Sequence, residues 1–253
     1  MKIIRAELNG DSFYAVLEGN KAKRLTKAPY DGVCFEGSEY ELSELKLLAP
    51  CEPNKVVAVG LNYGEHVQEM KNDMQRKADP ILFIKPASSV IADGETIVRP
   101  LHMSERTDYE AELGVVIGKT MKNVEKEDAK DYFFGYTCLN DVTARDLQKK
   151  DGQWTRAKGF DTFCPIGPHI ETELDPDNLR VQSILNGKVM QDDTTASMIN
   201  DIYELASHIS KIMTLVPGDV IATGTPKGIA PMEEGDEIIV RIEGIGDLKN
   251  IVK

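Results

Sequence analysis

Two glutamates, two residues apart, lie in the stretch of sequence that suggests chemistry, TDYEAELGVVIGK at 107–119. Side chains alternate between the two faces of a β-strand, so Glu110 and Glu112 are expected to leave the same face about 7 Å apart. The run that follows them, 113–117, is apolar on both faces, which is typical of a buried strand. Two carboxylates at the mouth of a buried strand repel each other and resist desolvation. They therefore need a proton, a cationic side chain or a metal ion beside them.

A third carboxylate, Asp141, follows the next apolar run, YFFGYTCL at 132–139. This run is expected to form a strand and residues 142–150 a helix, so Asp141 lies at a junction that can aim its side chain. Three carboxylates without a neighbouring histidine or thiolate make an all-oxygen site, which favours Mg²⁺ or Mn²⁺ over zinc or copper. The alternative is that Glu110 and Glu112 face solvent while Asp141 caps the helix.

A histidine and a glutamate follow the predicted buried strand at 55–61, within GLNYGEHVQEM. His66 and Glu69 lie three residues apart, which makes them neighbours on one face of a helix. A carboxylate beside an imidazole holds the ring in the arrangement of a base that activates water. The alternative is an exposed histidine on a charged helix. The helical spacing continues over 65–80 with few apolar residues, which also fits a lid over a substrate.

Other polar side chains could serve the same site. Lys85 ends the predicted strand at 80–86, and Lys158 lies in a predicted loop that contains a glycine. Each lysine could supply a cation to the site or lie at the surface. Arg145 and Gln148 are three residues apart on the helix that follows Asp141, on the side that Asp141 would present.

The composition excludes several classes of function. The 253 residues include 30 basic and 42 acidic side chains, and the net charge of −12 excludes nucleic acid as the main partner because no basic field is available for phosphates. The four cysteines are widely spaced, so reduced core thiols are expected rather than a disulfide framework or a structural zinc site. The sequence shows neither a signal-peptide core nor an apolar stretch of membrane-spanning length. We therefore expect a cytoplasmic protein that does not enter a membrane.

The pattern along the chain predicts a small N-terminal β domain at 1–50 and a catalytic domain at 51–253. Short alternating runs with glycine turns fill the first part, and prolines at 50 and 53 mark the joint. In the second part, Asn186-Gly187 predicts a type I′ hairpin, and an apolar stripe predicts a helix at 195–213. The glycine-rich loop at 224–228 lacks the spacing of a phosphate-binding loop, which argues against nucleotide chemistry.

Seven sequence blocks over residues 55–252 resemble, in this order, the fumarylacetoacetate hydrolase family: GLNYGEHVQEM, FIKPASS, DYEAELGVVIGK, GYTCLNDVTARDLQ, AKGFDTFCPIGP, LNGKVMQ and PGDVIATGTPKG. The resemblance implies an α+β, β-rich fold whose catalytic domain is a mixed β-sandwich or roll, and a homodimer. It implies a divalent metal held by Glu110, Glu112 and Asp141. It also implies a catalytic dyad of His66 and Glu69 on a lid. Four more side chains are placed near substrate oxygens: Arg145, Gln148, Lys158 and Thr225.

The resemblance is strongest to two branches of the family. One contains acylpyruvases and oxaloacetate decarboxylases. The other contains 2-hydroxyhepta-2,4-diene-1,7-dioate isomerases and 5-oxopent-3-ene-1,2,5-tricarboxylate decarboxylases of aromatic catabolism. Two departures from the family pattern, Asn200 in place of a frequent aromatic residue and Ala230 in place of a usual glycine, leave the identity of the substrate open.

The implied substrate is a short 2-keto acid that binds a metal through its carboxylate and keto oxygens. Cleavage beta to the ketone would leave a pyruvate enolate, which the metal and Lys158 would stabilise. Hydrolysis, decarboxylation and isomerisation share this enolate, so the motifs do not distinguish a hydrolase from a lyase or an isomerase, nor Mg²⁺ from Mn²⁺. A non-catalytic binder of metal and organic acids would need only the carboxylates, so the presence of His66, Glu69 and Lys158 favours an enzyme. Metal-dependent phosphoryl transfer is disfavoured because no phosphate cradle is present.

Overall fold

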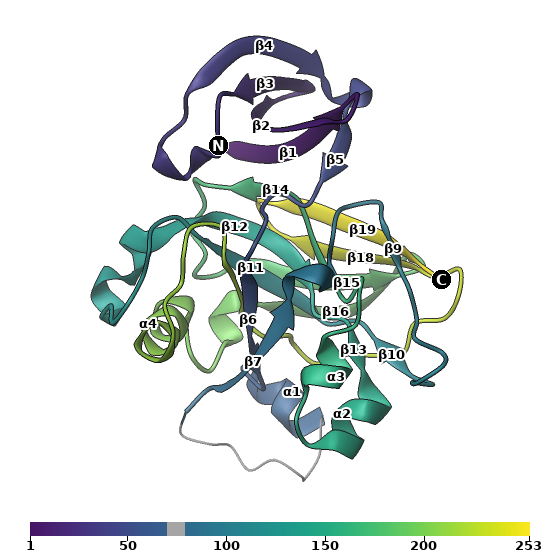
Figure 1. The fold of residues 1–253 in the computed structure, drawn as a ribbon. Helices are drawn as coiled ribbons and strands as arrows, with labels where there is room; N and C mark the ends of the chain where they lie inside the picture. Colours follow the sequence, from purple (N-terminus) through teal and green to yellow (C-terminus); the bar gives the residue numbers. More distant parts are fainter. Residues whose placement is uncertain (70–78) are drawn as a thin grey trace.

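The computed structural model describes residues 1–69 and 79–253, and it consists mainly of strands arranged in two large sheets (Figure 1). The larger sheet has 12 strands in the order β4-β3-β2-β1-β14-β12-β11-β17-β6-β7, with β5 paired to β1 and β8 paired to β14. The pairs β6–β17 and β8–β14 are parallel, whereas pairs such as β11–β12 are antiparallel, so the sheet is mixed. Its strands are β1 (Lys2–Leu8), β2 (Asp11–Glu18), β3 (Lys21–Leu25), β4 (Phe35–Glu41), β5 (Lys46–Leu48), β6 (Lys55–Gly60), β7 (Ile81–Pro86), β8 (Val90–Ile91), β11 (Ala111–Ile117), β12 (Phe133–Asn140), β14 (Cys164–Glu171) and β17 (Val220–Ala222).

The second sheet has five strands in the order β16-β15-β18-β19-β9, and a separate two-stranded pair joins β10 to β13. The bounds of these strands are β9 (Thr96–Ile97), β10 (Thr107–Asp108), β13 (Thr143–Ala144), β15 (Arg180–Leu185), β16 (Lys188–Thr194), β18 (Glu237–Ile242) and β19 (Gly246–Val252). The described helices are α1 (Gly64–Glu69), α2 (Arg145–Asp151), α3 (Thr155–Lys158) and α4 (Ile202–Ile212), with 3₁₀ turns at Pro29–Asp31, Leu42–Glu44, Ala87–Ser89, Lys126–Tyr132 and Thr195–Ser197. The expected β-rich α+β fold with mixed sheets is therefore confirmed.

Strand β11, which carries Glu112 and begins directly after Glu110, lies in the interior of the large sheet. All seven residues of β11 are buried, because β12 and β17 pair with its two edges and apolar clusters cover both faces. Leu113 and Val115 pack in the cluster that includes Val181 and Val240 of the second sheet, whereas Val116 belongs to the cluster on the opposite face. This alternation is the one that the sequence pattern predicts.

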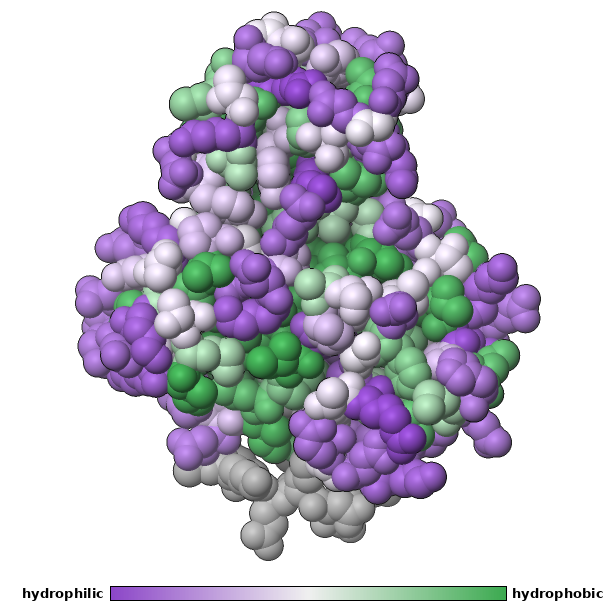
Figure 2. Space-filling model, in the orientation of Figure 1, coloured by the Kyte–Doolittle hydropathy of each residue, from purple (hydrophilic) through white to green (hydrophobic). Residues whose placement is uncertain are grey.

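The N-terminal strands β1–β5 stand at the top of the view in Figure 1 and join the body through the antiparallel pairing of β1 with β14. Their outer surface is largely hydrophilic (Figure 2), and surface ion pairs such as Lys21–Glu39 and Lys23–Glu18 cross it. Charged side chains on exposed strands discourage pairing with other chains. The division into domains at residue 50 stays a prediction.

Two predicted helices begin later than the sequence pattern indicates. The helix expected from residue 142 begins at Arg145, because Thr143 and Ala144 pair with β10 instead. The helix expected over 195–213 covers Ile202–Ile212, because Asp201 caps its start by accepting a hydrogen bond from the Glu204 N–H at 2.8 Å. The apolar stripe of this helix is not buried over its whole length, because Ile212 at its end is 54% exposed.

Other local predictions have mixed outcomes. The Asn186-Gly187 hairpin is confirmed, with φ angles of 50° and 78° that suit a type I′ turn. The helix predicted over 65–80 is present up to Glu69, and positions 70–78 lie outside the described residues. All four cysteines are free, but Cys34 is exposed rather than in the core. Among the helices described, none is long and apolar enough to cross a membrane.

Candidate active site

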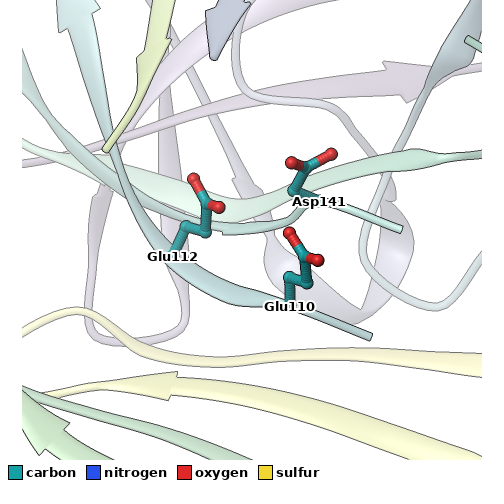
Figure 3. A group of neighbouring side chains, drawn as sticks. All are labelled: Glu110, Glu112 and Asp141. Atoms are coloured by element: carbon teal, nitrogen blue, oxygen red, sulfur yellow. The ribbon is translucent and has the colours of Figure 1, made fainter. Parts of the chain in front are cut away.

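Three carboxylates meet where the start of β11 lies beside the end of β12. In this antiparallel pair Ala111 is opposite Asn140, which places Glu110 next to Asp141, and the Asp141 N–H donates to the Glu110 carbonyl at 2.9 Å. One carboxylate oxygen from each of Glu110, Glu112 and Asp141 lies within 4.8 Å of the others (Figure 3). All three side chains are buried, which excludes the alternative of glutamates facing solvent.

Two lysines bind this cluster. Lys158 Nζ lies 2.8 Å from Glu110 Oε2 and 2.6 Å from Asp141 Oδ2. Lys85 Nζ lies 2.5 Å from Asp141 Oδ1 and 3.1 Å from the carbonyl oxygen of Val142. Their exposed fractions are 2% and 0%, so neither is a surface lysine. Lys158 ends helix α3 rather than lying in a loop, and Lys85 is the penultimate residue of strand β7.

The electrostatic environment differs among the glutamates. Burial alone would raise the pKa of Glu110, but the charges of Lys158 and Arg145 outweigh burial and hold that pKa well below its usual range. Burial raises the pKa of Glu112, and the nearby charges of Asp141 and Glu110 raise it further, well above its usual range. Burial lowers the pKa of Lys158, but Asp141 and Glu110 outweigh it and raise that pKa above its ordinary value.

Glu112 is therefore the carboxylate of the cluster that most needs another positive charge. Its Oε2 accepts a hydrogen bond from the Gly224 N–H at 2.8 Å, and neither lysine bonds to it. A hard divalent cation would supply the charge, since such ions prefer oxygen ligands. The three carboxylates thus fit Mg²⁺ or Mn²⁺, and their role as metal ligands stays a prediction.

The predicted dyad lies on α1, the helix that follows β6. His66 is 4% exposed, and its Nδ1 lies 3.1 Å from Glu69 Oε2. Burial raises the pKa of Glu69, but hydrogen bonds from His66 and from the Gly228 N–H outweigh it and lower that pKa below its ordinary value. An ionised carboxylate only accepts hydrogen bonds, so Nδ1 donates to Glu69 and Nε2 of His66 is the basic nitrogen. This orientation is what a general base requires.

A cleft of about 570 Å³ opens beside the dyad, within the size range of small-molecule sites. Its wall includes Glu69 and Gly228, and the ion pair of Lys227 with Glu65, 2.7 Å long, links the loop at 224–228 to helix α1. The other lining residues are Gln68, Met190 and Asp192.

Arg145 and Gln148, predicted to bind substrate oxygens, are bonded to each other. Arg145 Nη1 donates to Gln148 Oε1 at 2.6 Å, and Arg145 Nη2 donates to Glu110 Oε1. The carbonyl end of Gln148 is therefore occupied, and the amide nitrogen is the end that remains for a substrate oxygen. Arg145 also bonds to Asp108 and Glu110, so the structure links it to the carboxylate cluster as well as to Gln148.

The hydroxyl of Thr225 also has fixed partners. It donates to the Ala111 carbonyl at 2.9 Å and accepts from Gln191 Nε2 at 2.8 Å. A hydroxyl has one hydrogen, so Thr225 in this state can accept from a substrate but cannot donate to a keto or carboxylate oxygen. A contact of Thr225 with substrate is therefore limited to one in which the substrate is the hydrogen-bond donor.

Sequence reasoning missed two buried residues that hold the site. Asp108 binds Arg145, and it precedes Glu110 by two residues, so the strand alternation could have placed it on the same side. Gln191 accepts from the Ala111 N–H at 3.0 Å and so links the distant β16 to the glutamate strand. No local signal in the sequence identifies Gln191, because the partners of its side chain are at least 34 residues away.

Comparison with known proteins identifies the family of this chain. Residues 55–253 match the family model described as fumarylacetoacetate (FAA) hydrolase, C-terminal, and residues 1–50 match one described as Rv2993c-like, N-terminal. An uncharacterized protein of Methanocaldococcus jannaschii is 51% identical over 235 residues, 87% of this chain and 98% of that protein. Oxaloacetate tautomerase YisK of Bacillus subtilis is 39% identical over 261 residues, 98% of this chain and 85% of that protein. The solved structure of 2-hydroxyhepta-2,4-diene-1,7-dioate isomerase from Mycobacterium marinum has a TM-score of 0.92 at 40% identity, covering 100% of this chain and 98% of that one. The chain therefore belongs to the fumarylacetoacetate hydrolase family.

Proposed function

We propose that the protein is a divalent-metal-dependent enzyme that acts on short 2-keto acids, hydrolysing the C–C bond of acylpyruvates or decarboxylating oxaloacetate. The observation that carries this proposal is the buried Glu112, to which neither lysine of the cluster bonds, together with the buried His66, whose ring is hydrogen-bonded to Glu69. A bound divalent metal would supply positive charge at Glu112, and the pair of His66 and Glu69 can move a proton.

A second candidate is isomerisation or tautomerisation of the same class of acid. It is favoured by two relatives, an oxaloacetate tautomerase and a 2-hydroxyhepta-2,4-diene-1,7-dioate isomerase. In that reaction a proton leaves carbon and returns at another atom, with no bond to water formed. Decarboxylation of a 5-oxopent-3-ene-1,2,5-tricarboxylate belongs to the same candidate.

Glu110, Glu112 and Asp141 would hold Mg²⁺ or Mn²⁺, which when bound supplies Lewis-acid stabilisation of negative charge. The Lys158 ammonium lies in the same cluster and can donate a hydrogen bond to a substrate oxygen that gains charge. The amide nitrogen of Gln148 can orient the acid by a further hydrogen bond.

For hydrolysis, Nε2 of His66 would take a proton from water while the water oxygen attacks the carbonyl that lies beta to the ketone. The C–C bond then breaks, its electron pair forms the pyruvate enolate, and protonation gives pyruvate and a carboxylic acid. For oxaloacetate, the bond to the leaving carbon dioxide supplies the electron pair, and no water is consumed. The two reactions therefore differ in their need for His66.

The test is an assay of metal-stripped protein against acetylpyruvate and oxaloacetate, with Mg²⁺ or Mn²⁺ added back. Pyruvate formation from acetylpyruvate that depends on metal would support the hydrolase. Interconversion of oxaloacetate tautomers without pyruvate would support the second candidate. Metal binding without turnover of either acid would contradict both the hydrolase and the oxaloacetate decarboxylase, and it would leave a dioate isomerase or a non-catalytic binder of metal and organic acids. The expected homodimer and cytoplasmic location stay predictions.

A further inference from the structure

A buried aspartate lies behind the residues of the proposed site. Asp108, on β10, is 0% exposed, and its Oδ2 accepts from Arg145 Nε at 2.8 Å. On the outer side, Arg106 Nε donates to Asp108 Oδ1 at 2.8 Å and Arg106 Nη2 donates to Oδ2 at 3.1 Å. Asp108 therefore holds two guanidinium groups, one partly exposed and one buried.

The three nitrogens of Arg145 each bond to a different side chain. Nε bonds to Asp108, Nη1 to Gln148 and Nη2 to Glu110. Because the guanidinium group is planar and rigid, fixing the Nε edge also fixes the directions of the two Nη groups. A carboxylate at Nε thus sets the geometry of two bonds that it does not make itself.

We propose that Asp108 is a positioning residue that acts through Arg145 on both halves of the site. Toward the carboxylates, it aims Arg145 at Glu110 Oε1, which leaves Oε2 bonded to Lys158. Toward the substrate, it aims Arg145 at the carbonyl oxygen of Gln148, which presents the Gln148 amide nitrogen. The substrate half of this inference rests on the proposed function, whereas the carboxylate half requires only that the cluster binds a divalent ion.

A purely structural role for Asp108 is the competing explanation, since a buried carboxylate that pairs two arginines contributes to folding in any case. The two explanations differ in what changes when the carboxylate is neutralised. A structural role lowers stability without a specific effect on the ion or the substrate. A positioning role weakens ion binding and raises KM, and the KM effect disappears once Gln148 has been removed.

The experiment compares D108N with D146N, a matched change on helix α2. Asp146 accepts from Ser104 and from the Leu147 N–H, not from Arg145. Mn²⁺ affinity of the metal-stripped full-length protein is measured by titration calorimetry, and thermal stability is measured alongside. We expect D108N to weaken Mn²⁺ binding by ~10- to 100-fold, as is usual when a partner of a ligand is removed, and D146N to match the wild type.

The substrate half is measured as a cycle of D108N, Q148A and the double variant. Each single variant should raise KM for the acid that the wild type turns over, and D108N should add less than twofold to KM in the Q148A background. If D108N does not fold, R145K replaces it, because the single nitrogen of lysine cannot reproduce the planar fork that Asp108 orients toward Glu110 and Gln148, and the same losses are expected.

The inference is overturned if the folded variant binds Mn²⁺ like D146N, or if the KM effects of D108N and Q148A multiply independently. If the wild type binds Mn²⁺ but turns over no 2-keto acid, the proposed function fails, and the calorimetric comparison alone decides the inference. If the wild type does not bind Mn²⁺, both fail.

Discussion

Lys85 Nζ lies 2.5 Å from Asp141 Oδ1, and both side chains are almost wholly buried. The contact is one half of a matched pattern. Asp141 has one oxygen on Lys85 and the other on Lys158, and Glu110 has one oxygen on Arg145 and the other on Lys158. Asp141 and Glu110 thus each bond to one separate cation, Lys85 and Arg145 respectively, and they share Lys158.

Replacing Lys85 by methionine should destabilise the protein and weaken metal binding together. Breaking a buried ion pair by removing one partner costs about 3–5 kcal/mol, because the other charge stays buried. The free energy of unfolding is measured in urea and Mn²⁺ affinity by calorimetry. Lys55→Met is the control, since Lys55 pairs with the buried Asp219 away from the cluster. It should lower stability without changing Mn²⁺ affinity, and equal loss of affinity in both variants would refute a specific role for Lys85.

Replacing Glu112 by glutamine should abolish metal-dependent turnover and leave the metal-free protein at least as stable as the wild type. Loss of a ligand removes several kcal/mol of charge stabilisation in the transition state, a loss of ~100-fold or more in rate. Stability should hold because Glu112 in the metal-free folded protein has to keep a proton beside Asp141 and Glu110, whereas glutamine is neutral without binding one. Turnover and thermal unfolding, each with and without Mn²⁺, are the measurements. A large fall in metal-free stability would mean that the ionised Glu112 supports the fold.

Replacing His66 by alanine should reduce acylpyruvate hydrolysis by ~100-fold or more and reduce oxaloacetate decarboxylation much less, because only hydrolysis needs an activated water. The ratio of the two kcat values measures this. His208→Ala is the control, since His208 lies on α4, outside the site. Equal losses of both activities in His66→Ala would contradict water activation by this histidine.

The stability of the metal-free protein should fall as pH rises above the ordinary pKa of Glu112, 4.5, toward its raised value in the folded state. In that window the folded protein keeps a proton that the unfolded chain has lost, so stability decreases with pH. Below pH 4.5 Glu112 is protonated in both the folded and the unfolded protein, so it contributes nothing to the change of stability with pH. Urea unfolding at several pH values, compared between wild type and E112Q, isolates this contribution. Saturating Mg²⁺ should remove the difference between the two proteins in the slope of stability against pH. If the two slopes are already equal without metal, the raised pKa of Glu112 is contradicted.

Much of the fold and of the cluster could be predicted because the signals were local. Strand alternation placed Glu110 and Glu112 on one face, and the apolar run before Asn140 placed Asp141 at the end of the neighbouring strand. The helix starts were missed because tertiary contacts decided them: Thr143 and Ala144 pair with β10 rather than continuing into α2.

The long-range partners of the site could not be predicted in the same way. Lys85 and Asp141 are 56 residues apart, and Gln191 and Ala111 are 80 apart. Alternation and helical spacing describe neighbours within one element. They carry no information on which strand of a mixed sheet lies beside which other strand, so Lys85 remained an open choice until the sheet order was known.

The junction between β1 and β14 has a consequence for shortened versions of this chain. Lys2 and Ile3 pair with Glu171 and Ile170, so one end of β14 is covered by the first strand of the chain. A protein cut before Lys55 would present that end of β14 as an open edge, and exposed edges recruit strands from other molecules. In the full-length chain, the N-terminal segment would then prevent the sheet that holds the site from pairing with the same sheet of another molecule.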